Sequence, residues 1–208
     1  LLLRFSAPLQ SWGGSASKFE TRTTEHQPTK SGIIGLLSSA LGTQREDESK
    51  LASLNTLRLG IRVEREGNVM RDFHMVHQGK FSYLTKRYYL CDAVFLIALE
   101  TQDENFLATL SNAVKNPVYT LFLGRECCPP TYPLFYGIRN GTLLDVLKHE
   151  PPLTDNFPKR LIYETEENGT LVQDVPVSFS PLHRTHHYRR IREEYLFSTS
   201  EHDPMAEL

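Results

Sequence analysis

The segment from Gln27 to Gly42 constrains the fold most, because it contains both a start signal and a stop signal for a helix. Pro28 disfavours helical backbone in the residue before it, and Thr29 or Ser31 offers a hydroxyl that accepts a hydrogen bond from an unpaired N–H group of the first turn. Gly42 is placed to end the helix. Its wide apolar surface consists of Ile33, Ile34, Leu36, Leu37, Ala40 and Leu41.

The start of this helix also has the features of an anion site. Free backbone N–H groups and the positive end of the helix dipole lie beside Lys30 and two hydroxyls. Gly32 and Gly35 lower helix propensity, which indicates that a neighbouring strand or a phosphate approaches the backbone closely. Lys30 precedes the glycines, so the spacing is not that of an NTP-binding loop. The alternatives are an ordinary capped core helix and a small-molecule enzyme that binds phosphate here.

The composition is that of a globular protein with one large or two small domains, since 39% of the 208 residues are hydrophobic and 23% are charged. No apolar run approaches the roughly 18 residues that cross a membrane. The three cysteines include no Cys-x-x-Cys pair, which argues against a disulfide framework or a Cys-rich zinc site and favours a reducing cytoplasm. The net charge of −2 means that any nucleic-acid binding depends on local patches.

Hydrophobic periodicity predicts a mixed α+β fold. Strands are expected over 1–5, 57–65, 93–100 and 118–125, and helices over 29–42 and 104–114. The strand at 57–65 alternates strictly, so its charged side chains are expected to face outward, and Gln44 to Lys50 is expected to be a solvated turn. With a hairpin in the middle, this is the βαββαβ order of a ferredoxin-like fold.

The hairpin is predicted over Val69 to Leu90, where basic and aromatic residues are interleaved. Cations bind phosphates and rings stack on bases, so the pattern is typical of a platform for single-stranded RNA. Alternatively, the aromatic rings pack on the body of the protein. Trp12, beside two glycines at the end of the first strand, presents the same choice between stacking on a base and closing the core.

The C-terminal part is more polar from Leu134 on, with a helix signal over 142–149 and a boundary near Glu150. Two strands, 159–164 and 169–175, are expected to pair across the turn between them. The run from His183 to Arg192 holds four arginines and no acid, which favours a strand that binds a phosphate or a partner. The arginines expected to make these contacts are Arg184, Arg189, Arg190 and Arg192.

Four segments, in order, resemble the Cas-five family of the RAMP superfamily, whose type I-E members are subunits of the CRISPR Cascade complex. They are Ser6–Gly13, Pro28–Leu37, Arg71–His74 with Tyr89–Ala93, and Leu123–Pro129. The resemblance covers roughly residues 1–137 and weakly 176–196. It implies a ferredoxin-like (RRM/RAMP) domain over 1–137 with a β-hairpin thumb at about 67–92, and a small β-rich domain over 138–208.

The resemblance also implies a role. Such a chain would be a non-catalytic, cytoplasmic subunit, without metal or cofactor, that grips the 5′ handle of the CRISPR RNA and caps the backbone of the complex in antiviral defence. Its partners would be the CRISPR RNA, the adjacent backbone subunit, the large subunit and, through the complex, target DNA. The residues expected to contact RNA are Gln10, Ser11, Trp12, Gly13, Arg22, Thr29, Lys30, Ser31, Gly32, His74, Lys86, Arg87, Gly124 and Arg125.

The alternative is a metal-independent endoribonuclease that processes precursor CRISPR RNA, as in type I-C relatives. It requires a general base near a 2′-hydroxyl and a cation or acid near the leaving oxygen. The candidates are His74, His77, Lys80 and Tyr83 on the hairpin, or His183, His186 and His187 near the C-terminus. The second set has some ligand-like spacing, but no Asp or Glu lies within it, so no metal site is expected.

Overall fold

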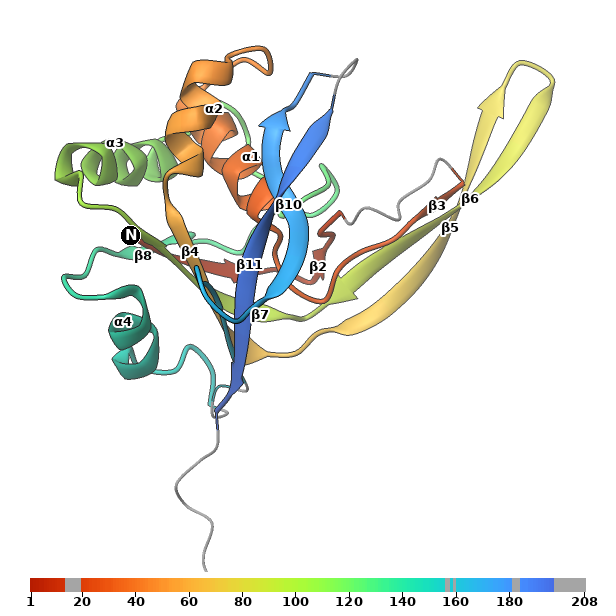
Figure 1. Ribbon diagram of the computed structural model, residues 1–208. Coiled ribbons are helices and arrows are strands. Elements are labelled where there is room, and N and C mark those ends of the chain that lie inside the picture. Colours follow the sequence, from red (N-terminus) through yellow and green to blue (C-terminus); the bar gives the residue numbers. More distant parts are fainter. Residues whose placement is uncertain (14–19, 156–157, 159, 181–183, 197–208) are drawn as a thin grey trace, which may run out of the picture.

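The computed structural model describes residues 1–13, 20–155, 158, 160–180 and 184–196, and shows a mixed α+β fold (Figure 1). A seven-stranded sheet has the order β10-β11-β9-β4-β7-β1-β8, and every neighbouring pair is antiparallel. Its strands are β1 (Leu2–Ser6), β4 (Arg58–Arg65), β7 (Val94–Glu100), β8 (Phe135–Gly137), β9 (Arg160–Glu164), β10 (Thr170–Ser178) and β11 (Thr185–Tyr195).

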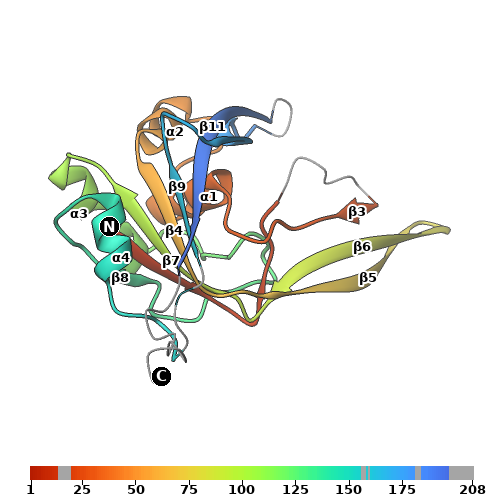
Figure 2. The same cartoon turned by 60° about the horizontal axis from the view of Figure 1, so that its bottom comes forward.

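Helices cover both faces of this sheet (Figure 2). On one face lie α1 (Lys30–Leu41), α2 (Glu48–Asn55) and α3 (Glu104–Lys115), whose apolar residues form the main core with the sheet. On the other face lies α4 (Leu143–His149), which packs on β7 and β9 in a smaller core. Within the described ranges, no helix combines the length and apolar character needed to cross a membrane.

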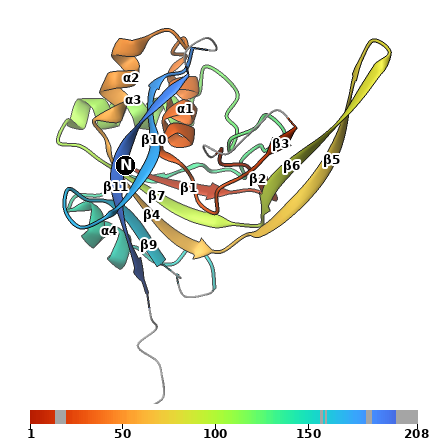
Figure 3. The same ribbon diagram turned by 45° about the vertical axis from the view of Figure 1, so that its right-hand side comes forward.

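A long hairpin projects from the body of the protein (Figure 3). It consists of β5 (Asn68–Gln78) and β6 (Phe81–Cys91), which pair along their whole length. The other edge of β6 pairs with the short strands β2 (Leu9–Gln10) and β3 (Thr21–Arg22), giving a second, four-stranded sheet. The hairpin therefore occupies the segment in which the sequence predicts it.

The predicted ends of α1 are confirmed. Thr29 is the N-cap residue and its hydroxyl accepts a hydrogen bond from the N–H group of Gly32. Gly42 ends the helix with a φ of 69°, in the left-handed region that glycine adopts without strain.

Two local predictions are wrong. Residues 118–125 form no strand, because the N–H groups of Val118 and Tyr119 donate to the last turn of α1, and β8 takes the edge position beside β1. The segment 44–50 is not entirely a turn, since α2 begins at Glu48, with Asp47 accepting a hydrogen bond from the N–H group of Lys50.

The prediction that the charged side chains of β4 face outward is also wrong, because α4 covers that face of the strand. The side chains of Arg62 and Glu64 are buried and lie 2.7 Å apart. Arg62 donates further hydrogen bonds to the carbonyls of Leu147 at 2.6 Å and Pro151 at 2.8 Å, at the end of α4. A buried ion pair that meets the free carbonyls of a helix end cannot be distinguished in sequence from an exposed charged face.

The C-terminal part contributes strands to the same sheet as the N-terminal part. β9 pairs with β4 over four residues, from Gly60 opposite Tyr163 to Val63 opposite Arg160. β11 then pairs with β9, and β10 with β11. The prediction that the strands at 159–164 and 169–175 pair across the turn between them is therefore wrong, because β11 lies between β9 and β10. A domain boundary at residue 137 stays a prediction, but the two parts share one continuous sheet.

Candidate nucleic-acid interface

The structure brings four of the predicted contact residues close together in the half of the hairpin nearest the body. β3 runs parallel to β6, so that Arg22 lies opposite Arg87 on one face of the sheet, whereas Lys86, which precedes Arg87 on β6, faces the other side. The N–H group of Lys86 donates to the carbonyl of Glu20, which extends this pairing. The loop after α3 adds Arg125, which contacts both strands.

Arg125 connects this cluster and does not point freely into solvent. Its guanidinium donates to the carbonyl of Tyr88 at 3.2 Å and to the carbonyl of Arg22 at 3.1 Å, and lies 4.8 Å from the centre of the Tyr89 ring. Gly124 has a φ of 97°, and a Cβ atom there would lie 1.7 Å from the carbonyl oxygen of Ser11. Gly124 is therefore needed for the close approach that places Arg125.

The remaining three cations of the cluster have no carboxylate partner among the residues that the structure describes. Arg22 and Lys86 are exposed, and the Nε atom of Arg87 is buried without a hydrogen-bond partner. Asp72 lies opposite Arg87 in the hairpin, but its carboxylate is 2.6 Å from the Nε2 atom of His74. We call Arg22 and Arg87, which share one face of the sheet, the hairpin-base cluster.

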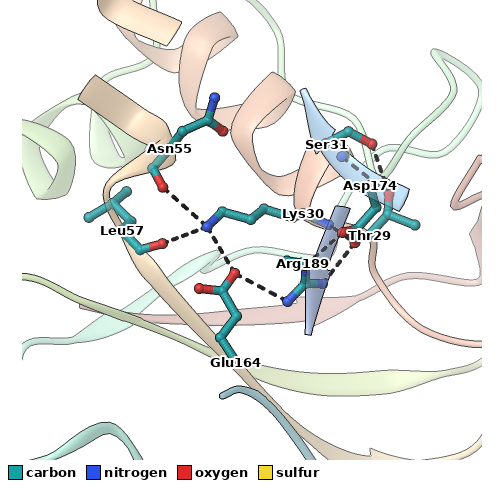
Figure 4. A network of polar contacts seen from close by, with 9 residues as sticks. Thr29, Lys30, Ser31, Asn55, Leu57, Glu164, Asp174 and Arg189 are labelled. Carbon is teal, nitrogen blue, oxygen red and sulfur yellow. Dashed lines mark hydrogen bonds and ion pairs between the residues drawn. The ribbon is translucent and has the colours of Figure 1, made fainter. Parts of the chain in front are cut away.

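Lys30, in contrast, is buried and does not serve as a phosphate ligand (Figure 4). Its ammonium group lies 2.8 Å from a carboxylate oxygen of Glu164 and donates to the carbonyls of Leu57 at 2.9 Å and Asn55 at 3.2 Å. The prediction for Lys30 is wrong because these partners come from segments far away in the sequence.

A carboxylate of the chain itself occupies the predicted anion site at the start of α1. The N–H group of Lys30 donates to Asp174 Oδ2 at 2.8 Å (Figure 4). The Nε and Nη2 atoms of Arg189 donate to the same carboxylate at 2.6 and 2.7 Å. Arg189 also lies 3.2 Å from Glu164, so it is an internal residue and not the partner contact that the sequence suggests. Thr29 is used as the helix cap, with the Ser31 hydroxyl 3.3 Å away. Sequence analysis missed Asp174 and Glu164, since each reads as an ordinary polar residue of a strand.

The loop after β1 is also more buried than predicted. Trp12 is fully buried, stacks on Phe5 with 5.5 Å between ring centres, and donates its Nε1–H to the side chain of Gln10 at 3.2 Å. Gln10 in turn donates to the carbonyl of Ala93 at 2.7 Å. A Cβ atom on Gly32 would lie 2.9 Å from the Trp12 ring, so the glycine accommodates the ring. Trp12 and Gln10 are therefore core residues and cannot contact a base.

The other loop residues differ in exposure. Ser11 is buried and its N–H group donates to the carbonyl of Leu123 at 3.0 Å. Gly13 is exposed, and nothing lies within 4 Å of a Cβ atom built on it. Of this loop, only Gly13 remains available for the predicted contact with RNA.

The hairpin histidines do not form one catalytic site. Side chains alternate along a strand, so His74 and His77, three residues apart on β5, lie on opposite faces. His74 faces the side of Tyr83, while the ring of His77 lies 2.8 Å from the Ser82 hydroxyl, and Lys80 is in the turn. An acid and a base for RNA cleavage would need to lie on one face, and of the four hairpin candidates only His74 and Tyr83 share a face.

The C-terminal histidines are separated in the same way. His186 and His187 are consecutive on β11 and face opposite sides, and His183 lies outside the described residues. Burial lowers the pKa of His186, and the nearby Arg184 lowers it further, so this ring is neutral at pH 7. Among the described residues, no three His, Cys, Asp or Glu side chains are grouped as metal ligands.

Two cysteines adjoin the hairpin-base cluster. The Cys127 sulfur lies 3.5 Å from the Tyr89 hydroxyl and 3.9 Å from the Cys128 sulfur. Burial raises the pKa of Cys128 to about 12, so its thiol is protonated at neutral pH and is a weak nucleophile.

Comparison with known proteins adds to this geometry. The sequence pattern of the family described as CRISPR-associated protein (Cas_Cas5) matches residues 1–192. The "CRISPR system Cascade subunit CasD" of Escherichia coli (strain K12) is 39% identical over 158 residues, which cover 66% of this chain and 70% of that protein.

Two solved structures share the fold. One, described as "Crystal structure of Cas protein", has a TM-score of 0.76 and 37% identity, and covers 94% of both chains. A chain of a "CRISPR RNA-guided surveillance complex" has a TM-score of 0.76 and 29% identity, and covers 93% of this chain and 88% of that one.

Proposed function

This chain belongs to the CRISPR-associated Cas5 family. We propose that it is a non-catalytic subunit of a Cascade complex and that it grips the 5′ handle of the CRISPR RNA. The similarity to the E. coli Cascade subunit and to a chain of an RNA-guided surveillance complex supports membership of such an assembly. The RNA would lie at the base of the hairpin.

The observation that carries this proposal is the hairpin-base cluster. Arg22 and Arg87 come from two strands that only the folded chain brings together, they share one face of the sheet, and neither is paired with a carboxylate among the described residues. The phosphates of a single strand are the natural partners of such cations. Arg125 would act as a positioning residue, because its guanidinium is already used to hold β3 and β6.

The hairpin would also act as the thumb that contacts a neighbouring subunit. Half of the large apolar side chains that are exposed within the described ranges belong to it, namely Val69, Met70, Phe73, Met75, Phe81, Tyr83 and Leu84. A soluble protein rarely exposes so many apolar groups on one element unless a partner covers them. The adjacent backbone subunit is the partner that this role requires, and the large subunit and target DNA would be reached through the complex.

We further infer a ferredoxin-like topology for the part of the sheet made by β4, β7, β1 and β8. Strand, helix, strand, hairpin, strand, helix and strand follow one another along the chain, and the spatial order is β4-β7-β1-β8. This order places the hairpin between the second and third strands of the motif, where the projecting β5 and β6 are found.

The test measures binding and cleavage on the same samples. 5′-labelled repeat RNA, incubated with the full chain in EDTA, is divided between a filter-binding assay and a denaturing gel. Replacing both Arg22 and Arg87 by Ala should weaken retention and lower the slope of log K against log salt by about 1.4, since each phosphate contact on a single strand contributes about 0.7. Lys50→Ala, which removes an exposed lysine from α2, serves as the control and should leave the slope unchanged.

The gel distinguishes the proposed role from that of the endoribonuclease. We expect no cleavage product. A discrete product that disappears in His74→Ala or His77→Ala would overturn the non-catalytic role. An unchanged salt slope in the double variant of Arg22 and Arg87 would overturn the site.

A further inference from the structure

A second basic and aromatic face lies on β10 and β11, which belong to a different sheet from the hairpin (Figure 3). Because side chains alternate along β11, Tyr188, Arg190 and Arg192 share one face of the strand. Tyr188 is 64% exposed, and the side chain of Arg192 is 57% exposed. Leu171 of β10 lies opposite Arg190 in the register and is also exposed. We call these four residues the β11 patch.

The β11 patch is the uncovered continuation of the face on which α4 packs. Arg192 lies opposite Tyr163 of β9, and Tyr163 is buried in the small core that includes Leu143 and Leu147 of α4. Beyond Tyr163 no described helix covers this face. The opposite face of β11 faces the main core, where Ile191 is buried and Arg189 is held by Asp174.

The arginines of the patch are only weakly engaged. Arg190 Nη1 lies 3.5 Å from the carbonyl of Gly169, and Arg192 Nε lies 3.5 Å from the carboxylate of Glu194. Glu194 also accepts a hydrogen bond from the Tyr163 hydroxyl and lies 3.5 Å from Lys148 Nζ, so one carboxylate is shared by two cations. The patch therefore retains positive charge.

A hollow of about 780 Å³ opens beside Arg190 and Arg192. Its other wall is the turn between β9 and β10, which carries Glu166 and Glu167. Glu193 also lines the hollow, but its carboxylate is paired with Arg160 at 2.6 Å. The carboxylates of Glu166 and Glu167 therefore oppose an anion in the hollow, so that removing their charge should strengthen its binding.

We propose that the β11 patch binds a single nucleic acid strand, with Arg190 and Arg192 on neighbouring phosphates and Tyr188 stacked on a base. Alternate residues of a strand are roughly 6.7 Å apart, which is comparable to the spacing of phosphates along an extended strand. An acidic peptide would satisfy the arginines but would leave the ring of Tyr188 without a flat partner, whereas each nucleotide supplies both a phosphate and a base. The guanidinium groups would contact phosphates and the ring would contact a base face. DNA and RNA have both features, so the patch is expected to bind them equally.

The probes are fluorescein-labelled oligo(dT) and oligo(U) of about 15 nucleotides, within the range of site sizes of single-strand binders. Fluorescence anisotropy is measured with the full chain carrying Arg22→Ala and Arg87→Ala, so that binding at the hairpin base does not mask the patch. Tyr188→Ala should weaken binding of both probes about 5- to 150-fold. Arg190→Ala with Arg192→Ala should lower the salt slope by about 1.4.

The controls are matched in residue type and exposure. Tyr195 is 65% exposed and lies on the same strand but on its opposite face, and the side chain of Arg58 is 60% exposed at one end of β4. Tyr195→Ala and Arg58→Ala should leave the affinity and the salt slope unchanged. Replacing Glu166 and Glu167 by Gln should strengthen binding, because it removes two negative charges opposite the arginines.

Several results would overturn the proposal. The patch is not the site if the Tyr188 and arginine variants bind both probes as the parent does, or if the control variants lose as much affinity. Ultraviolet crosslinking followed by peptide mapping provides a second measurement that does not depend on variants, and absence of the Tyr188 peptide among the crosslinked products would also refute it. A negative result for the β11 patch would not affect the proposal that repeat RNA binds at the hairpin base, so the two proposals are tested independently.

Discussion

At the scale of single residues, burial decides which cations can bind a ligand. Lys30 and Lys86 both appear in segments that suggest phosphate binding. Lys86 is exposed on the hairpin, whereas Lys30 is 5% exposed and has three acceptors for its ammonium group. A buried ammonium must be paired, so Lys30 stabilises the fold and leaves no free donor for RNA.

Replacing Lys30 by Ala should lower the free energy of unfolding by about 3 kcal/mol, because Glu164 and two carbonyls then lose a buried partner. The matched control is Lys50→Ala, which removes an exposed ion pair with Asp47 and should change stability by less than about 1 kcal/mol. Urea unfolding measures both. Equal losses in the two variants would contradict the structural role of Lys30.

At the scale of elements, α1 shows that packing against a neighbouring ring can require a glycine within a helix. Gly32 and Gly35 both lower helix propensity, but only one of them is required by packing. A Cβ atom on Gly32 would lie 2.9 Å from the Trp12 ring, while a Cβ atom on Gly35 would meet only Phe179 at an ordinary 3.8 Å. The two glycines therefore have opposite expected responses to the same substitution.

Gly35→Ala should stabilise the protein by about 0.5–1 kcal/mol, because it restores helix propensity without a clash. Gly32→Ala should instead destabilise it by about 1 kcal/mol, since overpacking against Trp12 costs more than the propensity gains. Thermal unfolding shows whether each variant is stabilised or destabilised, and Trp12 fluorescence should change only in Gly32→Ala. A stabilised Gly32→Ala variant would show that the ring moves aside without cost.

At the scale of the whole molecule, the C-terminal strands are joined to the N-terminal part by both backbone and side-chain contacts. β9 continues the sheet beside β4, and Asp174 of β10 accepts a hydrogen bond from the first N–H group of α1. Arg160 of β9 pairs with Glu66 after β4 and with Glu193 of β11. All of these contacts except the pair of Arg160 with Glu193 cross residue 137, the boundary that the family resemblance implies.

We therefore expect residues 1–137 and 138–208 to unfold in one transition. Fluorescence of Trp12 reports the N-terminal part, and hydrogen exchange of the β9–β11 amides under increasing urea reports the C-terminal part. Their midpoints should coincide, and Asp174→Asn should lower both by the same amount. Two separate transitions would instead support a C-terminal domain of independent stability.

Local sequence patterns are sufficient for the features that depend on near neighbours. A cap at Thr29 or Ser31, the end at Gly42, the helix at α4 and the pairing of β5 with β6 follow from patterns within a few residues, because capping and periodicity are local. Arg22, Lys86 and Arg87 were recognised as cations, although not as neighbours.

Which polar groups are available to a ligand depends instead on contacts that form in the folded chain. Asp174 fills the N-terminus of α1 from 144 residues away, Trp12 packs into the core, and β8 takes the sheet edge expected of residues 118–125. The physical reason is that an arginine, lysine or tryptophan has the same local signal whether its partner is solvent, RNA or a distant strand. The choice among them depends on long-range contacts, which no short sequence pattern encodes.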